Sequence, residues 1–102
     1  MSKKKKQPVV EYTRPFMPIA EFRKYAEENN IPLTDEFFDI KRGVTFKTGE
    51  IVNVLNGYDI LYKGLQIKGF DLSPTKNRPN AIVYVYDDSY WFAIEISRIF
   101  KQ

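Results

Sequence analysis

Apolar and polar residues follow two different periods along the chain. Between residues 18 and 29 the apolar side chains recur at the spacing of one helix face: Ile19, Phe22, Tyr25 and Ala26. Pro18 suits the first helical position, and Asn29-Asn30 followed by Pro32 ends the segment. The pattern predicts a helix over 18–29 whose apolar stripe has to dock on another element, because a single helix of this length is marginal in water.

From residue 44 onward, apolar residues recur with the period of two that is typical of strands. Short runs of this kind, separated by Gly-containing turns or by polar loops, occupy 44–47, 51–55, 58–62, 65–70, 81–86 and 90–96. Asn56-Gly57 is a strong hairpin signal. Segment 34–40 is predicted to form a single helical turn, and 71–80 a long polar loop with two prolines.

These elements predict an α+β fold, mainly β, with one globular domain over residues 9–102. In it, the N-terminal helix packs on a five- to six-stranded antiparallel barrel or curled sheet over about 44–101. Residues 1–8 are expected to form a disordered basic tail, because its lysines repel each other and nothing there can be buried.

The last hairpin, residues 81–96, holds the only tryptophan, Trp91. An even-numbered loop between residues 86 and 91 would separate two classes of side chain. Val83, Val85, Phe92 and Ile94 would then face the core. Tyr84, Tyr86 and Trp91 would share the outer face. That face is either an exposed binding platform or a surface that the predicted helix covers, and the sequence leaves both open.

Composition narrows the function classes. The chain has 102 residues with no cysteine and no histidine, so thiol nucleophiles and the commonest general base and metal ligand are missing. The few acidic clusters, such as Asp87-Asp88, fall short of a metal site. An enzyme is not expected, and neither a cofactor, a metal nor a small-molecule substrate is predicted. No apolar run is long enough to cross a membrane, and a cytoplasmic location is expected.

The formal net charge of +3 does not describe the body of the protein, since four of the 16 Lys and Arg side chains lie in the tail. The remaining 12 face 13 acidic side chains, which makes the body near neutral. The high content of Lys, Asn and Ile is typical of small proteins of AT-rich bacteria and their phages, and this suits an accessory or host-interaction protein.

Three stretches of the sequence, within about residues 44–101, resemble strands of a known type of small β-barrel, and the resemblance concerns the fold only. FKTGEIVNV (46–54) resembles the opening strand of SH3-like small barrels, and DDSYWFAIEISRIF (87–100) resembles their end. KGLQIKGFD (63–71) resembles the second strand of the KOW and Tudor-like branch. The resemblance implies a binding module for peptides, modified tails, nucleic acid or other domains. The acidic loop and ALYDY-type strand of signalling SH3 domains are missing, which argues against proline-rich peptides.

Two binding hypotheses follow. The first is a small protein-interaction module, an accessory or inhibitor that docks on a larger protein through Tyr84, Tyr86, Trp91, Lys76 and Arg78. The alternative is nucleic-acid binding, in which the same aromatic rings would stack on bases. Its basic residues would be Lys3, Lys4, Lys5, Lys6, Lys63 and Lys68. The acidic residues beside the rings would repel phosphate and favour the first hypothesis. The oligomeric state stays open, because an uncovered sheet edge can pair with a second copy.

Overall fold

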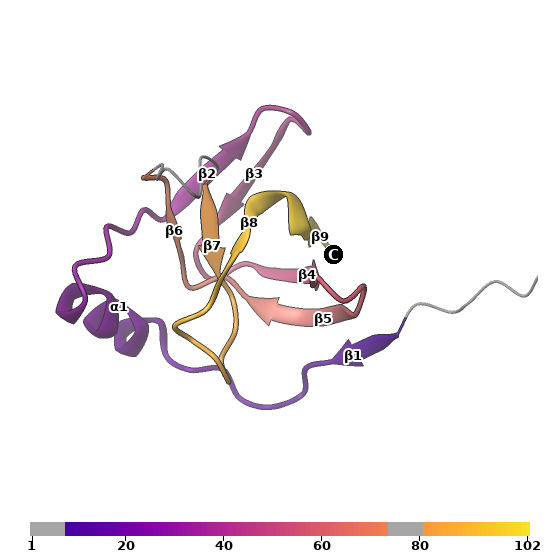
Figure 1. The fold of residues 1–102 in the computed structure, drawn as a ribbon, viewed down its shortest axis with the longest axis horizontal. Coiled ribbons are helices and arrows are strands. Elements are labelled where there is room, and N and C mark those ends of the chain that lie inside the picture. The colour runs from indigo at the N-terminus through magenta and orange to yellow at the C-terminus, as the bar shows by residue number, and fades with distance from the viewer. Residues whose placement is uncertain (1–7, 74–80) are drawn as a thin grey trace, which may run out of the picture.

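The computed structural model describes residues 8–73 and 81–102 (Figure 1). Its elements are β1 (Val9–Glu11), α1 (Ile19–Glu28), β2 (Glu36–Asp39), β3 (Val44–Lys47), β4 (Ile51–Leu55), β5 (Leu61–Gln66), β6 (Gly69–Asp71), β7 (Ile82–Tyr84), β8 (Ala93–Glu95), the 3-10 turn η1 (Ile96–Arg98) and β9 (Ile99–Lys101). The described part of the chain is therefore mainly β with one α-helix, as the sequence predicts. None of its helices has the length and apolar character needed to cross a bilayer.

The strands form three open sheets, with the orders β1-β5-β4-β9, β2-β3 and β6-β7-β8. Most pairs are antiparallel, but β1 runs parallel to β5, with Val9 opposite Leu61 and Glu11 opposite Lys63. The strands within the predicted range 44–101 pair antiparallel, and the parallel edge is added by β1, which lies before that range. Nothing in the local pattern of VVE distinguishes the two directions, because both show the same side-chain alternation.

Helix α1 lies within the predicted boundaries and ends in a tight turn. Asn30 has a φ of 55°, and the N–H of Ile31 donates to the carbonyl of Ala26 at 2.8 Å. This closure satisfies the last helical carbonyls and brings Ile31 back against the helix. No side chain caps the start at Pro18, so docking has to hold the helix in place.

The helix docks on the β6-β7-β8 sheet through Phe22 and Ala26. The rings of Phe22 and Tyr84 lie 5.0 Å apart, and Phe22 is fully buried. The opposite side of the same sheet carries Val83 and Ile94, which belong to a second apolar cluster built on β3, β4, β5 and β9. One sheet thus separates two cores, and the helix closes the smaller one.

Segment 34–40 does not form the predicted helical turn, and β2 pairs instead with β3 as an antiparallel hairpin. Phe37 faces Phe70 at a ring distance of 6.1 Å, whereas Phe38 points to solvent. This is strand alternation, which a run of four residues cannot distinguish from one helical turn. Asp39 then accepts hydrogen bonds from the backbone N–H groups of Lys41 and Arg42 and closes the connecting turn.

Two of the predicted strands differ in their boundaries from the strands of the structure. The predicted strand over 58–62 begins only at Leu61, because the Asn56 side chain accepts hydrogen bonds from the N–H groups of Tyr58 and Ile60 and holds residues 56–60 as a loop. The predicted strand over 65–70 is broken at Ile67 and Lys68, where the chain passes from one sheet to another. Most of the predicted loop over 71–80 lies outside the described residues.

The register of the β7-β8 hairpin is the predicted one. Val83 lies opposite Ile94 and Tyr84 opposite Ala93. The pairing stops there, however, and two expectations beyond it are wrong. Phe92 is exposed instead of buried in the core, and Tyr86 lies against the larger cluster, away from the helix that buries Tyr84. The chain leaves the sheet after Tyr84, so strand alternation no longer sets the directions of these side chains.

Helix docking predicts the effect of Phe22→Ala. Removing this fully buried ring should lower the free energy of unfolding by ~3–5 kcal/mol, measured by urea denaturation followed by circular dichroism. Lys24→Ala, on the exposed side of the same helix, should change it by less than ~0.5 kcal/mol. A loss below ~1 kcal/mol for Phe22→Ala would contradict the docked helix.

Candidate functional site

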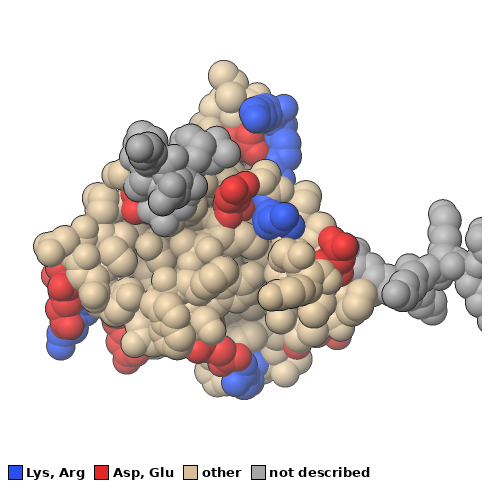
Figure 2. Space-filling view, in the orientation of Figure 1, with Lys and Arg blue, Asp and Glu red and all other residues tan. Residues whose placement is uncertain are grey.

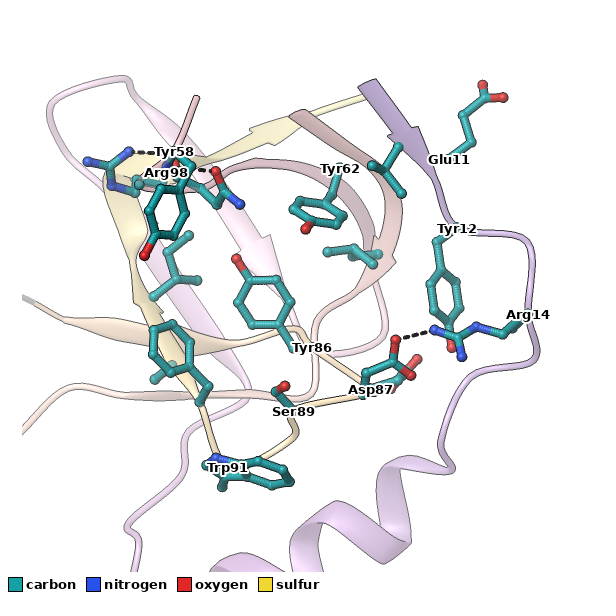
Figure 3. Close-up of a pocket in the computed structure, with 18 of the residues that line it drawn as sticks. Glu11, Tyr12, Arg14, Tyr58, Tyr62, Tyr86, Asp87, Ser89, Trp91 and Arg98 are labelled. Atoms are coloured by element: carbon teal, nitrogen blue, oxygen red, sulfur yellow. Dashed lines mark hydrogen bonds and ion pairs between the residues drawn. The ribbon is translucent and has the colours of Figure 1, made fainter. Parts of the chain in front are cut away.

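A cavity of about 1130 Å³ lies between the N-terminal part of the chain and the loop that joins β7 to β8 (Figure 3). Its residues come from five segments: 10–14, 56–58, β5 (Tyr62 and Leu65), 86–95 and Arg98. Segment 10–14 is brought there by the parallel pairing of β1 with β5. The cavity thus depends on the contact between the N-terminal segment and the middle of the chain.

Aromatic side chains dominate the cavity. The ring of Tyr86 lies 6.1 Å from that of Tyr62 and 5.9 Å from that of Phe92. Tyr58 and Trp91 stand at its edge, and Trp91 is 58% exposed. Four of the seven tyrosines line it: Tyr12, Tyr58, Tyr62 and Tyr86. Large exposed rings around a concave surface are typical of a site that binds another molecule.

The hydroxyl groups of Tyr62 and Tyr86 point into the cavity in Figure 3. Burial raises the pKa of Tyr86, the neighbouring Tyr62 raises it further, and the positive charge of Arg98 partly opposes both. Tyr86 therefore keeps its proton at neutral pH and can donate a hydrogen bond. No partner for either hydroxyl is found among the described residues.

A buried ion pair closes the cavity next to Tyr86. The Lys68 ammonium lies 2.9 Å from a carboxylate oxygen of Asp87, and the two side chains are 0% and 6% exposed. Lys68 comes from the corner between β5 and β6, whereas Asp87 comes from the loop after β7. The pair therefore fixes that loop against the other sheet. Each ion would be costly to bury without the other.

Residues 12–18, named here the N-terminal strap, connect β1 to α1 (Figure 1). One of them, Phe16, lies over this ion pair. The Phe16 ring lies 5.0 Å from the Lys68 ammonium and stacks on Tyr12 at 5.1 Å. Arg14 forms an ion pair with Asp88, the residue after the buried aspartate. Burial raises the pKa of Tyr12, and the nearby carboxylate of Asp87 raises it further. The Tyr12 hydroxyl itself donates to the carbonyl of Pro15 at 3.0 Å. The strap is thus held at several points along the loop.

The three aromatic residues predicted as one platform do not share a face. Tyr84 is only 6% exposed beneath the helix, so it is not available to a partner. Tyr86 lies inside the cavity and Trp91 at its edge. The structure therefore keeps two of the three together and replaces the flat outer face by a concave site on the other side of the sheet.

Of the basic residues of the nucleic-acid hypothesis, the two that the structure describes, Lys63 and Lys68, do not line the cavity. Lys68 is fully buried and paired, so it cannot reach a phosphate. Lys63 is exposed on β5 but does not line the cavity. Lys3, Lys4, Lys5, Lys6, Lys76 and Arg78 lie outside the described residues. Charged side chains on the face shown in Figure 2 are few and of both signs. Across residues 8–73 and 81–102, no group of three or more acidic side chains is placed to hold a metal ion.

Several cavity residues were missed by the sequence analysis: Tyr12, Tyr58, Tyr62 and Arg98. The feature of the sequence that could have pointed to the missed tyrosines is the number of tyrosines outside the predicted helix and the last hairpin. The number of tyrosines does not reveal that Tyr12 and Tyr62 line the same cavity, since the parallel pairing of β1 with β5 brings their segments together.

A scan against protein-family models, a search of curated proteins and a search of solved structures each find no match. The function of the chain therefore has to be inferred from the cavity itself.

The ion pair predicts a large effect for Lys68→Met. The substitution should lower the free energy of unfolding by ~3–5 kcal/mol, because it leaves Asp87 charged and unpaired in a buried place. Urea denaturation followed by the fluorescence of Trp91 measures it. The double variant Lys68→Met/Asp87→Leu, which removes both charges, should recover much of the loss. Lys63→Met, a matched change on the surface of β5, should have little effect. An equal loss for Lys68→Met and Lys63→Met would contradict the buried pair.

Proposed function

We propose that the chain is a non-enzymatic protein-interaction module, and that the aromatic cavity is where it docks on a larger protein. The observation that carries the proposal is the concave site itself, in which exposed Trp91 and Phe92 stand beside Tyr62 and Tyr86. Tryptophan and tyrosine are the residues that most often contribute large binding energies at protein interfaces.

The electrostatics of the site support a protein partner more than a nucleic acid. Asp87 and Asp88 belong to the loop that lines the cavity, and their charges are already balanced by Lys68 and Arg14. A nucleic-acid backbone needs several cations along its path. Among the described residues, Arg98 is the one cation of the cavity without a carboxylate partner.

The earlier resemblance to SH3-like barrels fits this proposal, since small barrels of that type serve as binding modules. The open sheets support a small β-rich fold, and membership of that barrel type stays part of the proposal. A cytoplasmic location and a role as accessory or inhibitor protein belong to it as well.

The proposal predicts that cavity substitutions weaken partner binding. Trp91→Ala and Tyr62→Ala should each weaken it by roughly 30-fold or more, the loss expected of a central interface residue. The matched control is Phe38→Ala on β2, because Phe38 is also 58% exposed but lies outside the cavity. Affinity capture identifies the candidate partner, and titration of the purified pair measures each dissociation constant.

A photo-crosslinking amino acid at position 58 adds a direct readout, because Tyr58 stands at the edge of the cavity. It should crosslink to the same partner, whereas the probe at position 38 should not. Equal binding by Trp91→Ala, Tyr62→Ala and Phe38→Ala would contradict the proposal. So would quenching of Trp91 by a single-stranded oligonucleotide that Tyr62→Ala abolishes.

A further inference from the structure

Two strands that stand at the ends of their sheets line the cavity, β1 and β8. Among the described residues, β7 is the one strand that pairs with β8 (Figure 1). The opposite edge of the same sheet is covered, because Thr34 exchanges two backbone hydrogen bonds with Phe70 of β6, at 2.8 and 3.0 Å. The fold thus closes one edge of this sheet and leaves the edge beside the cavity open. An open edge presents backbone groups to which another strand can bind.

The backbone groups of β8 point alternately toward β7 and away from it. The N–H of Ile96, directly after β8, donates to the carbonyl of Ala81, directly before β7, at 3.3 Å. The groups of Ile94, two residues earlier, therefore face β7 as well. It follows that the N–H and C=O groups of Ala93 and Glu95 face away from the sheet.

Three of these outward groups have no hydrogen-bond partner among residues 8–73 and 81–102: the N–H and C=O of Ala93 and the N–H of Glu95. The carbonyl of Glu95 is used, because it stands at the N-cap of η1 and accepts the first bond of that turn. Both residues line the cavity, so the open edge forms part of its rim. The three groups have the spacing of a strand, and a second extended backbone matches it.

A strand added at this edge would also reach the rings of the cavity. Side chains opposite one another in a sheet lie on the same face, so the residue opposite Ile94 would share its side. Ile94 lines the cavity and belongs to the larger apolar cluster, against which Tyr62 and Tyr86 pack. Glu95 is exposed on the other face of β8 and has no cation partner among the described residues. A Lys or Arg opposite Glu95 would therefore be favourable.

The edge of β1 offers less to an added strand. Val9 and Glu11 also direct backbone groups outward, since Pro8 and Tyr12 on either side bond to β5. All three residues of β1 are exposed, however, so β1 has no buried face that another strand could extend. β8 has such a face in Ile94, which is only 7% exposed.

We propose that an extended segment of the partner protein adds to the open edge of β8 as an antiparallel strand. One residue of the segment exchanges two backbone hydrogen bonds with Ala93. The residue two positions before it, a Lys or Arg, accepts a hydrogen bond from the N–H of Glu95. The residue between them places an apolar side chain against Tyr62 and Tyr86. This inference rests on the proposed protein-binding function, and it names the conformation and side-chain pattern of the partner.

A short blocked peptide tests the pairing without the natural partner. Acetyl-Thr-Lys-Phe-Thr-Val amide has Lys for the position opposite Glu95, then Phe opposite Ile94 and Thr opposite Ala93. It is titrated into the full chain, and amide chemical shifts together with Trp91 emission report binding. N-methylation of the Thr after Phe removes the N–H that bonds to Ala93 and should weaken binding by about tenfold or more. N-methylation of Phe removes an N–H that faces away from β8 and should have little effect.

Glu95→Pro blocks the same edge in the protein itself. Glu95 has a φ of −65° and a ψ of 144°, a conformation that proline adopts, and no acceptor for its N–H is found among the described residues. The variant should stay folded, with dispersed amide spectra, and should bind the peptide about tenfold or more weakly. The control Glu95→Gln keeps the N–H and removes only the charge, so it should lose about threefold. The N-methylated peptides, which use the unchanged chain, decide the matter if Glu95→Pro does not fold.

Amide hydrogen exchange locates the added strand. The amide protons of Ala93 and Glu95 should exchange more slowly in the peptide complex than in the free chain, because both become hydrogen-bonded. Slowed exchange at Val9 and Glu11 in their place would put the strand on β1 and contradict the inference.

Three further outcomes would overturn it. Equal effects of the two N-methylations, with binding still dependent on Trp91, would exclude strand addition and leave the docking function standing. Failure of the unmethylated peptide to bind at millimolar concentration would also overturn it, whereas capture of a partner that depends on Trp91 would still support the proposed function. A dimer of the free chain that Glu95→Pro dissociates would assign the edge to a second copy of the chain instead.

Discussion

The buried pair of Lys68 and Asp87 is the contact on which the arrangement of the site depends. Lys68 sits where the chain crosses from one sheet to another, and Asp87 opens the loop between β7 and β8. Neither charge has access to water to compensate it, so the corner, the loop and the covering strap have to remain together. Phe16 of the strap lies over the ammonium and excludes solvent from it.

The cavity is a consequence of this constraint. The ion pair that fixes Asp87 also fixes its neighbour Tyr86. Trp91 and Phe92 belong to the same short loop and are thereby held at the edge of the cavity. The opposite wall comes from β1 and β5, which the strap ties to the same loop. Large rings are therefore kept partly exposed and close together. Exposed rings do not add to the stability of the fold, because their apolar surface stays in contact with water. A binding role explains why so much aromatic surface is left open.

The sequence predicts the parts that depend on local pattern. Helix 18–29, the strands at 44–47 and 51–55 and the register of the last hairpin follow from periodicity and turn residues. The site was only partly predictable, since the expected row of Tyr84, Tyr86 and Trp91 assumed that the strands continue to the end of the hairpin. They stop at Tyr84, and the loop beyond is directed by the ion pair. A lysine 19 residues before its aspartate gives no local signal of that contact. For the same reason, Lys68 looked like a surface cation.

The most direct test of this account is nuclear magnetic resonance of the Lys68 side chain in the full chain at neutral pH. A sequestered ammonium under Phe16 should give slowly exchanging Nζ protons and nuclear Overhauser contacts from its methylene groups to the Phe16 ring. Upfield-shifted methylene signals should accompany them, because the group lies over an aromatic face. Fast exchange with water and no contact to Phe16 would show that Lys68 is exposed, and would contradict both the covered ion pair and the cavity built on it.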